Sequence, residues 1–296
     1  MPTVEKQSAK GVKAKTKVSF KQLTNEATKM KILLYGQSGS GKTSFWSTFP
    51  GRLAVIICSG GNNTNETLSL SKDDKKRVYA ASVEHAEELK TLIEQVGNDH
   101  MFDTVILDHV SGLQDIVLKD ILGLDEIPVQ KGWGLASQQQ YGQCTQQCKE
   151  YLRALLNLDK NVVIIGQERT FGGSDESLSS DLVTPTVGVA TVPSLAGWLY
   201  PACDYVVQAF KRPRMITSEK KIGNKTITTE RRGKGIDYCL RCEPHDVFTT
   251  KFRVPKGHYL PGSIVDPNYV KLRSVIEGTY KESEPPKKVA KKKATS

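Results

Sequence analysis

The chain has 296 residues, of which 38% are hydrophobic, and a formal net charge of +10 at pH 7. This length permits a substantial core in one large α/β domain or two small ones, and we expect one domain. No apolar run approaches the roughly 20 residues that span a bilayer, and the N-terminus lacks the apolar segment of a signal peptide, so we expect a soluble, intracellular protein. Six cysteines are too few for a disulfide scaffold in a chain of this length, and we expect reduced thiols.

The positive charge is concentrated at the two ends of the chain. Residues 1–21 carry six lysines and one acid, and residues 285–296 carry five lysines and no acid, so each end has a net charge of +5. Neither end has enough large apolar residues to offset the entropy lost on ordering. We therefore expect disordered basic arms at 1–29 and 281–296. Such arms either add sequence-independent attraction to nucleic-acid phosphates or serve only solubility.

A glycine-rich motif follows the apolar run at residues 31–35. Its sequence GQSGSGKT matches G-x-x-x-x-G-K-[ST] at every fixed position. In such a P-loop, backbone N–H groups and the next helix bind phosphate, the lysine contacts the terminal phosphates and the threonine holds Mg²⁺. A chance match in a glycine-rich turn is the alternative, but the preceding strand and the helix expected at 42–48 favour a nucleoside triphosphate site. Its expected residues are Gly36, Gln37, Ser38, Gly39, Ser40, Gly41, Lys42, Thr43 and Ser44.

Further along the chain, apolar β-rich runs alternate with helical patterns, which predicts a mainly parallel sheet flanked by crossover helices. The expected strands are 31–35, 53–58, 77–80, 104–108, 161–166 and 204–209. The expected helices are 42–48, 83–96, 111–122 and 137–157. Near the C-terminus, segments 222–229, 236–242 and 246–254 predict an antiparallel β extension at one sheet edge, with turns such as Gly223-Asn224.

The strand expected at 104–108 ends in a carboxylate, as does the second magnesium-binding element of P-loop proteins. Asp108 is therefore the candidate second Mg²⁺ residue beside Thr43. An acid at a strand end can also cap the following helix, which is the alternative. The next residue is His109, which argues against helicase and AAA+ arrangements in which a glutamate base follows the aspartate.

Together these motifs resemble the RecA-like P-loop ATPases, and most closely a set of phage-encoded ATP-binding proteins, some of them single-strand recombinases or annealing proteins. The resemblance covers roughly residues 30–280 and rests also on segments 133–142, 161–168 and 192–207. It implies a RecA-like ATPase domain at 30–280 that binds ATP and Mg²⁺. It further implies a homo-oligomeric ring or filament with DNA-dependent ATPase activity in recombination or single-strand annealing.

The resemblance assigns catalytic roles beyond Lys42 and Asp108. Gln167 and Glu168 directly follow the strand expected at 161–166, at the position where related proteins carry a polar γ-phosphate sensor. Lys251 and Arg253 match a Lys-x-Arg pair that reaches the γ-phosphate of a neighbouring subunit, and their spacing places both on one strand face. A solvated strand face is the alternative for this pair.

One position departs from the family pattern. Related proteins carry a water-orienting glutamate on the strand after the P-loop helix, whereas this chain has Ser59 there. Serine cannot act as a carboxylate base at neutral pH. Hydrolysis is then slow, uses Glu66 or Glu168, or is lost while binding persists. A nucleotide-gated DNA-binding or assembly module with little or no hydrolysis is therefore the alternative function.

A basic segment at 211–234 is the best candidate for a nucleic-acid interface, since it holds nine basic and two acidic residues. It has no aromatic residue for base stacking, so we expect it to bind the backbone of single-stranded DNA with little sequence preference. The loop at 170–192 is a weaker candidate because it holds several acids. The expected contacts are Lys211, Arg212, Arg214, Lys220, Lys221, Arg231, Arg232 and Lys234.

The paired cysteines have more ordinary interpretations than metal binding. Cys239 and Cys242, with His245 nearby, match half of a zinc site, but the second pair is missing. Cys144 and Cys148 lie one helical turn apart, and we expect them to pack in the core.

Overall fold

The computed structural model describes residues 29–58, 70–125, 136–172, 185–222 and 225–281, with the backbone alone at 215–222 and 225–230. The two expected basic arms lie outside these residues, apart from Lys29 and Lys281 at their inner ends. Ser59, Glu66 and most of the loop at 170–192 also lie outside them.

An eight-stranded sheet forms the centre of the molecule, in the order β10-β9-β8-β1-β5-β4-β2-β3. Six strands run parallel where they pair with one another: β1 (Lys31–Tyr35), β2 (Leu53–Ile57), β3 (Val78–Ser82), β4 (Thr104–Asp108), β5 (Asn161–Gly166) and the start of β8 (Tyr205–Ile222). Strands β9 (Lys225–Arg241) and β10 (Ser263–Val265) extend it antiparallel. The predicted parallel α/β core with an antiparallel extension is confirmed. Strand β5 separates the P-loop strand β1 from the Asp108 strand β4.

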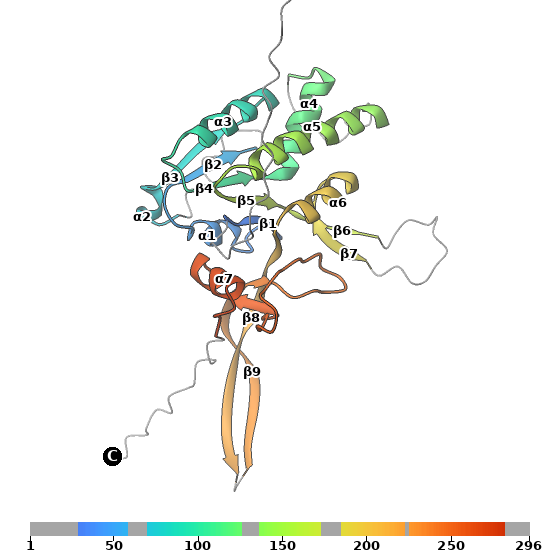
Figure 1. Cartoon of the computed structure of the whole chain (residues 1–296). Coiled ribbons are helices and arrows are strands. Elements are labelled where there is room, and N and C mark those ends of the chain that lie inside the picture. Colours follow the sequence, from blue (N-terminus) through green and yellow to red (C-terminus); the bar gives the residue numbers. More distant parts are fainter. Residues whose placement is uncertain (1–28, 59–69, 126–135, 173–184, 223–224, 282–296) are drawn as a thin grey trace, which may run out of the picture.

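Helices cover both faces of the sheet (Figure 1), because alternate residues of each buried strand point to opposite faces. Leu33 and Tyr35 pack with α3 (Ala86–Asn98), α4 (Val110–Leu122), α5 (Gln138–Leu156) and α6 (Pro193–Ala202). Ile32 and Leu34 pack on the other face with Phe45 of α1 (Lys42–Trp46) and with α7 (Tyr269–Ile276). Each β1 residue from Ile32 to Tyr35 is fully buried. The P-loop therefore follows a strand that is fixed from both sides.

Local sequence signals set the ends of several helices. Ser137 and Gln140 form a capping box at the start of α5, with Gln140 N donating to Ser137 Oγ. Helix α4 begins after His109, whose Nδ1 accepts from the backbone N–H of Gly112 at 2.9 Å, and it ends at Gly123 in the left-handed conformation. The short α2 (Lys72–Lys75) has Ser71 as its N-cap.

The sequence did not predict α2, α6, α7, β10 or the small sheet of β6 (Glu168–Phe171) and β7 (Thr186–Val189).

Strands β8 and β9 form a long hairpin that projects from the body (Figure 1). Their ladder runs from Gln208↔Arg241 to Ile222↔Lys225, with a register shift between Pro213 and Met215. The sequence predicted shorter strands here, at 204–209, 222–229 and 236–242, because the polar stretch between them has no apolar alternation. Backbone pairing with the partner strand continues through that stretch.

The strand expected at 246–254 is wrong. Within this segment the structure has only two isolated bridges, Val187↔Phe248 and Val206↔Lys251. From Gln208 onward the free edge of β8 is already paired with β9, so the segment can reach β8 only at Val206. Lys251 and Arg253 therefore do not share a strand face.

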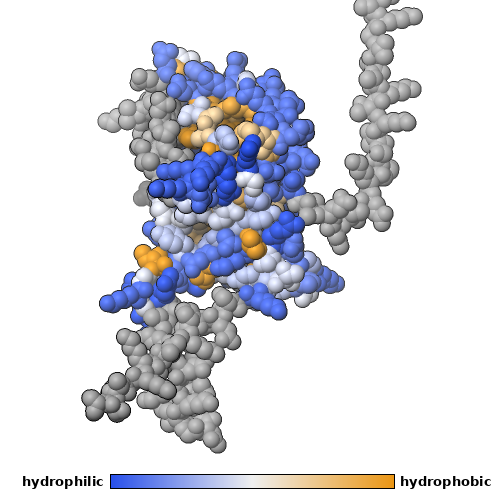
Figure 2. Space-filling model, turned by 90° about the vertical axis from the view of Figure 1, so that its left-hand side faces the viewer, coloured by the Kyte–Doolittle hydropathy of each residue, from blue (hydrophilic) through white to orange (hydrophobic). Residues whose placement is uncertain are grey.

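The opposite edge of the sheet is formed by β3. Figure 2 looks onto this side of the molecule, where an apolar patch interrupts a mainly hydrophilic surface. Within the described ranges, no helix is long and apolar enough to cross a membrane.

Candidate nucleotide site

The P-loop backbone is shaped by two glycines, at positions where a side chain would be strained or would clash. Gly41 precedes α1 with φ +91°, in the region that favours glycine. A Cβ atom on Gly36 would lie 2.2 Å from the carbonyl oxygen of Ala209, so β8 passes directly against the start of the loop. The loop thus turns sharply between β1 and α1, and the N-terminus of α1 points into the space that the loop surrounds.

Lys42 lies over the loop that it follows. Its Nζ donates to the carbonyl oxygens of Gly36 and Gln37, each at 2.8 Å. These contacts hold a cation at the mouth of a ring of backbone groups, where the terminal phosphates of a nucleotide are expected.

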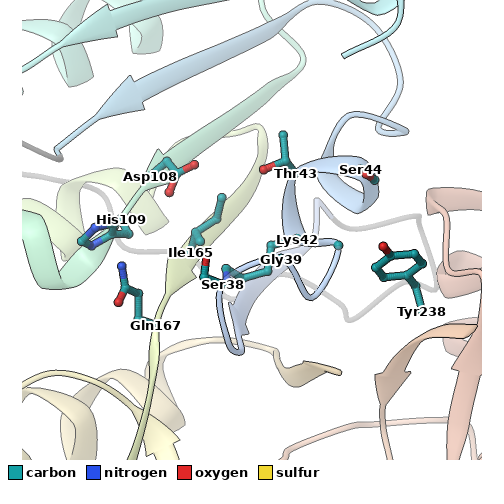
Figure 3. Close-up of a pocket in the computed structure, with 11 residues that line it drawn as sticks. Ser38, Gly39, Lys42, Thr43, Ser44, Asp108, His109, Ile165, Gln167 and Tyr238 are labelled. Carbon is teal, nitrogen blue, oxygen red and sulfur yellow. The ribbon is translucent and has the colours of Figure 1, made fainter. Parts of the chain in front are cut away.

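A cavity of about 360 Å³ opens beside the P-loop. It brings together Lys42, Thr43, Asp108 and Gln167, which come from α1, β4 and the end of β5 (Figure 3). The sequence predicted all four as site residues. The other lining residues are Ser38, Gly39, Gly41, Ser44, His109, Ile165 and Tyr238. The predicted Gln37 and Ser40 line a second cavity of about 210 Å³ behind the loop.

Asp108 ends β4 with only 8% of its surface exposed. The helix cap at this point is provided by the His109 ring, so the alternative role of Asp108 as the cap of α4 is wrong. Burial, with the Asp108 charge nearby, raises the pKa of the Cys58 thiol on the neighbouring strand. A carboxylate and the Thr43 hydroxyl at one cavity are hard oxygen ligands, and they fit a nucleotide-bound Mg²⁺.

Gln167 and Glu168 face different cavities. Gln167 lines the P-loop cavity, whereas Glu168 lines the second cavity. The Glu168 carboxylate accepts from Gln208 Nε2 at 3.0 Å, and Gln208 Oε1 accepts from Arg241 Nε at 3.0 Å. The Arg241 guanidinium lies over the Phe248 ring, 4.4 Å from its centroid. Among the described lining residues of the P-loop cavity, Asp108 is the only carboxylate.

Lys251 is placed at the end of a helix and not at the cavity of its own chain. Its Nζ donates to the carbonyl oxygens of Tyr200, Pro201 and Cys203 at 3.4, 3.0 and 2.5 Å. A lysine at the C-terminal carbonyl groups of α6 satisfies unpaired acceptors and complements the helix dipole. Arg253 is exposed. The role of this pair at a neighbouring subunit stays a prediction.

Most of the predicted nucleic-acid cations lie along the hairpin. Lys211, Arg212 and Arg214 on β8 are exposed, as are Arg231, Arg232 and Lys234 on β9. Lys220 and Lys221 belong to β8, in the part whose side chains are not described. Arg214 Nε pairs with Asp237 Oδ1 at 2.7 Å. Lys211 lies at the root of the hairpin and lines the second cavity beside Gln37, so it is closer to the P-loop than to the hairpin tip.

The cysteines pack as ordinary core residues. Cys144 and Cys148 are buried in the core on the α5 side, and Cys242 is buried on the opposite face. In the part of the chain that the structure describes, no three His, Cys, Asp or Glu side chains gather as a metal site.

The sequence missed Tyr238 as a residue of the cavity. Its position depends on the β8–β9 register, where it pairs with Lys211, and on the packing of this root against the P-loop. A pattern of alternating strand residues gives no signal for such a contact.

The fold and the site together define a P-loop ATPase of the α/β class. The chain belongs to the AAA domain family, whose model matches residues 28–254. No curated protein matches the chain. This family match does not bear on the glutamate-after-aspartate arrangement against which His109 argues. The residue after Asp108 is still histidine, which in this chain caps α4.

Proposed function

We propose that this protein is a RecA-like, DNA-dependent ATPase that acts in DNA recombination or single-strand annealing as a homo-oligomer. The observation that carries ATP binding is the convergence of Lys42, Thr43, Asp108 and Gln167 on one cavity beside a glycine-shaped P-loop. AAA family membership supports the same activity. A phage origin and the recombinase class rest on the sequence resemblance.

Each group at the cavity has a separate role in nucleotide binding. The backbone N–H groups of the P-loop and the start of α1 bind phosphate. The Lys42 ammonium gives up its hydrogen bonds to the carbonyl oxygens of Gly36 and Gln37 and donates to the terminal phosphate oxygens instead. Thr43 and Asp108 would hold Mg²⁺, which neutralises charge on the β- and γ-phosphates when bound. The Gln167 amide can donate a hydrogen bond to the γ-phosphate.

The hairpin supports the DNA part of the proposal. Its exposed cations project from the body on a two-stranded ribbon, where they can follow a phosphate backbone. This arrangement has no base-reading element among the described residues 211–214 and 231–234, so binding should show little sequence preference.

A nucleotide-gated module with little hydrolysis is the second candidate. It is favoured by the orientation of Glu168, which accepts from Gln208 in the second cavity and not from a group at the P-loop. Ser59 at the position of the family glutamate points the same way.

ATP turnover with and without single-stranded DNA distinguishes the two candidates. We expect slow basal turnover that DNA accelerates. Lys42→Ala should remove most ATP affinity, about 10- to 100-fold, because a charge-assisted contact worth about 1.5–3 kcal/mol is lost. Lys72→Ala on α2, an exposed lysine, is the control. Turnover that is absent with and without DNA, together with tight ATP binding, would favour the module. Unchanged ATP binding by Lys42→Ala would overturn the site assignment.

A further inference from the structure

The root of the hairpin lies against the P-loop through both of its strands. Lys211 on β8 and Tyr238 on β9 are directly paired. Lys211 Nζ lies 3.8 Å from the position that a Cβ atom on Gly39 would occupy, and a Cβ atom on Gly41 would lie 2.9 Å from Cδ1 of Tyr238. The Tyr238 ring therefore packs on the loop backbone where α1 begins.

The cavity has two distinct ends. Asp108, His109 and Gln167 lie at one end, and Ser44 and Tyr238 lie at the other (Figure 3). In a P-loop site Mg²⁺ bridges the β- and γ-phosphates, so these phosphates belong at the Asp108 end. The nucleoside must then leave the loop toward Ser44 and Tyr238.

Tyr238 has ring surface to offer a ligand at this end. The backbone of Gly41 covers part of the ring, yet the residue is 42% exposed and lines the cavity. Stacking of a base on an aromatic side chain is worth roughly five- to more than a hundredfold in affinity and tolerates any base.

We propose that Tyr238 forms the base-binding wall of the nucleotide cavity, with its ring stacked on the purine of bound ATP. The inference rests on the proposed function, because it needs a triphosphate in the P-loop. It makes the root of the hairpin a part of the nucleotide site, on the same strand, β9, that carries Arg231, Arg232 and Lys234.

Binding of MgATP and of magnesium tripolyphosphate, measured by calorimetry, separates the base from the phosphates. The variants are Tyr238→Ala, Tyr238→Phe and the control Tyr79→Ala. Tyr79 is a control because it is 43% exposed and, like Tyr238, belongs to a strand of the sheet. It lies on β3, at the edge away from the hairpin. Circular dichroism of each variant checks that the fold is intact.

Tyr238→Ala should lower ATP affinity about tenfold or more while tripolyphosphate affinity stays within about twofold. Tyr238→Phe should retain ATP affinity because the ring is kept, and Tyr79→Ala should bind both ligands as the wild type does. Wild-type ATP affinity in Tyr238→Ala, or an equal loss for both ligands, would overturn the inference. In that event the proposed function stands if Lys42→Ala still loses both ligands. Failure of the wild type to bind ATP would overturn both.

Discussion

The Glu168 carboxylate accepts a hydrogen bond from Gln208 Nε2 at 3.0 Å, although the residue before it, Gln167, lines the P-loop cavity. Gln167 lies between β5 and β6 and Glu168 begins β6, and the two side chains line different cavities. Glu168 joins a chain of contacts that runs through Gln208 to Arg241.

We therefore predict that Glu168→Gln changes the ATP turnover number by less than about threefold. Its amide oxygen can still accept from Gln208, and the P-loop cavity loses no group. Gln167→Ala is the matched comparison and should lower turnover about tenfold or more, since it removes the donor that we propose for the γ-phosphate. Steady-state turnover of both variants tests this. A hundredfold loss in Glu168→Gln would show that this carboxylate acts as the base.

A second prediction concerns Lys251, whose ammonium contacts three carbonyl groups at the end of α6. Lys251→Ala should lower the free energy of unfolding by about 1–2 kcal/mol because partly exposed carbonyl groups at the helix end lose a charged donor. Arg253→Ala, at an exposed position, should change it by less than about 0.5 kcal/mol. Urea unfolding of both variants measures the difference. If Lys251 instead acts only on a neighbouring subunit's nucleotide, turnover falls and the stability does not.

A third prediction concerns DNA binding by the hairpin. Replacing Arg231, Arg232 and Lys234 by alanine should weaken single-strand binding similarly across sequences. Each lost phosphate contact should lower the log–log salt slope by about 0.7. The control replaces three exposed lysines, which are Lys72 and Lys75 of α2 and its C-cap Lys76.

The salt titration of this DNA binding must be run with and without residues 1–21 and 285–296, since these segments together carry +10. If removing them abolishes binding while the hairpin variant of the full chain binds normally, the hairpin is not the DNA interface.

The last prediction concerns Asp115 on α4, where burial raises the carboxyl pKa to about 6. A raised folded-state pKa stabilises the protein below the unfolded value of about 4, and this contribution is lost as pH rises through about 6. Asp115→Asn removes the buried charge, so the variant should be more stable than the wild type at pH 7, by an amount on the order of 1 kcal/mol after discounting for partial exposure. Thermal unfolding from pH 4 to pH 8 checks this. A stability difference that does not shrink toward pH 4 contradicts the assignment.

The sequence by itself determined the P-loop side of the candidate nucleotide site. The P-loop follows one short apolar run and Asp108 ends another, and such runs, alternating with helical patterns, are typical of the buried strands of a parallel sheet. Because the carboxyl ends of parallel strands meet at one edge, local patterns were enough to bring Lys42, Thr43, Asp108 and Gln167 together.

Only the tertiary structure decided where Tyr238, Lys251 and Glu168 lie. Tyr238 reaches the P-loop through the register of a long hairpin, and Lys251 reaches the end of α6 because β9 already occupies the edge of β8. Glu168 lines the second cavity, and it begins β6, which pairs with β7 in a separate two-stranded sheet. These placements depend on pairing between segments far apart in the sequence, which no local periodicity records.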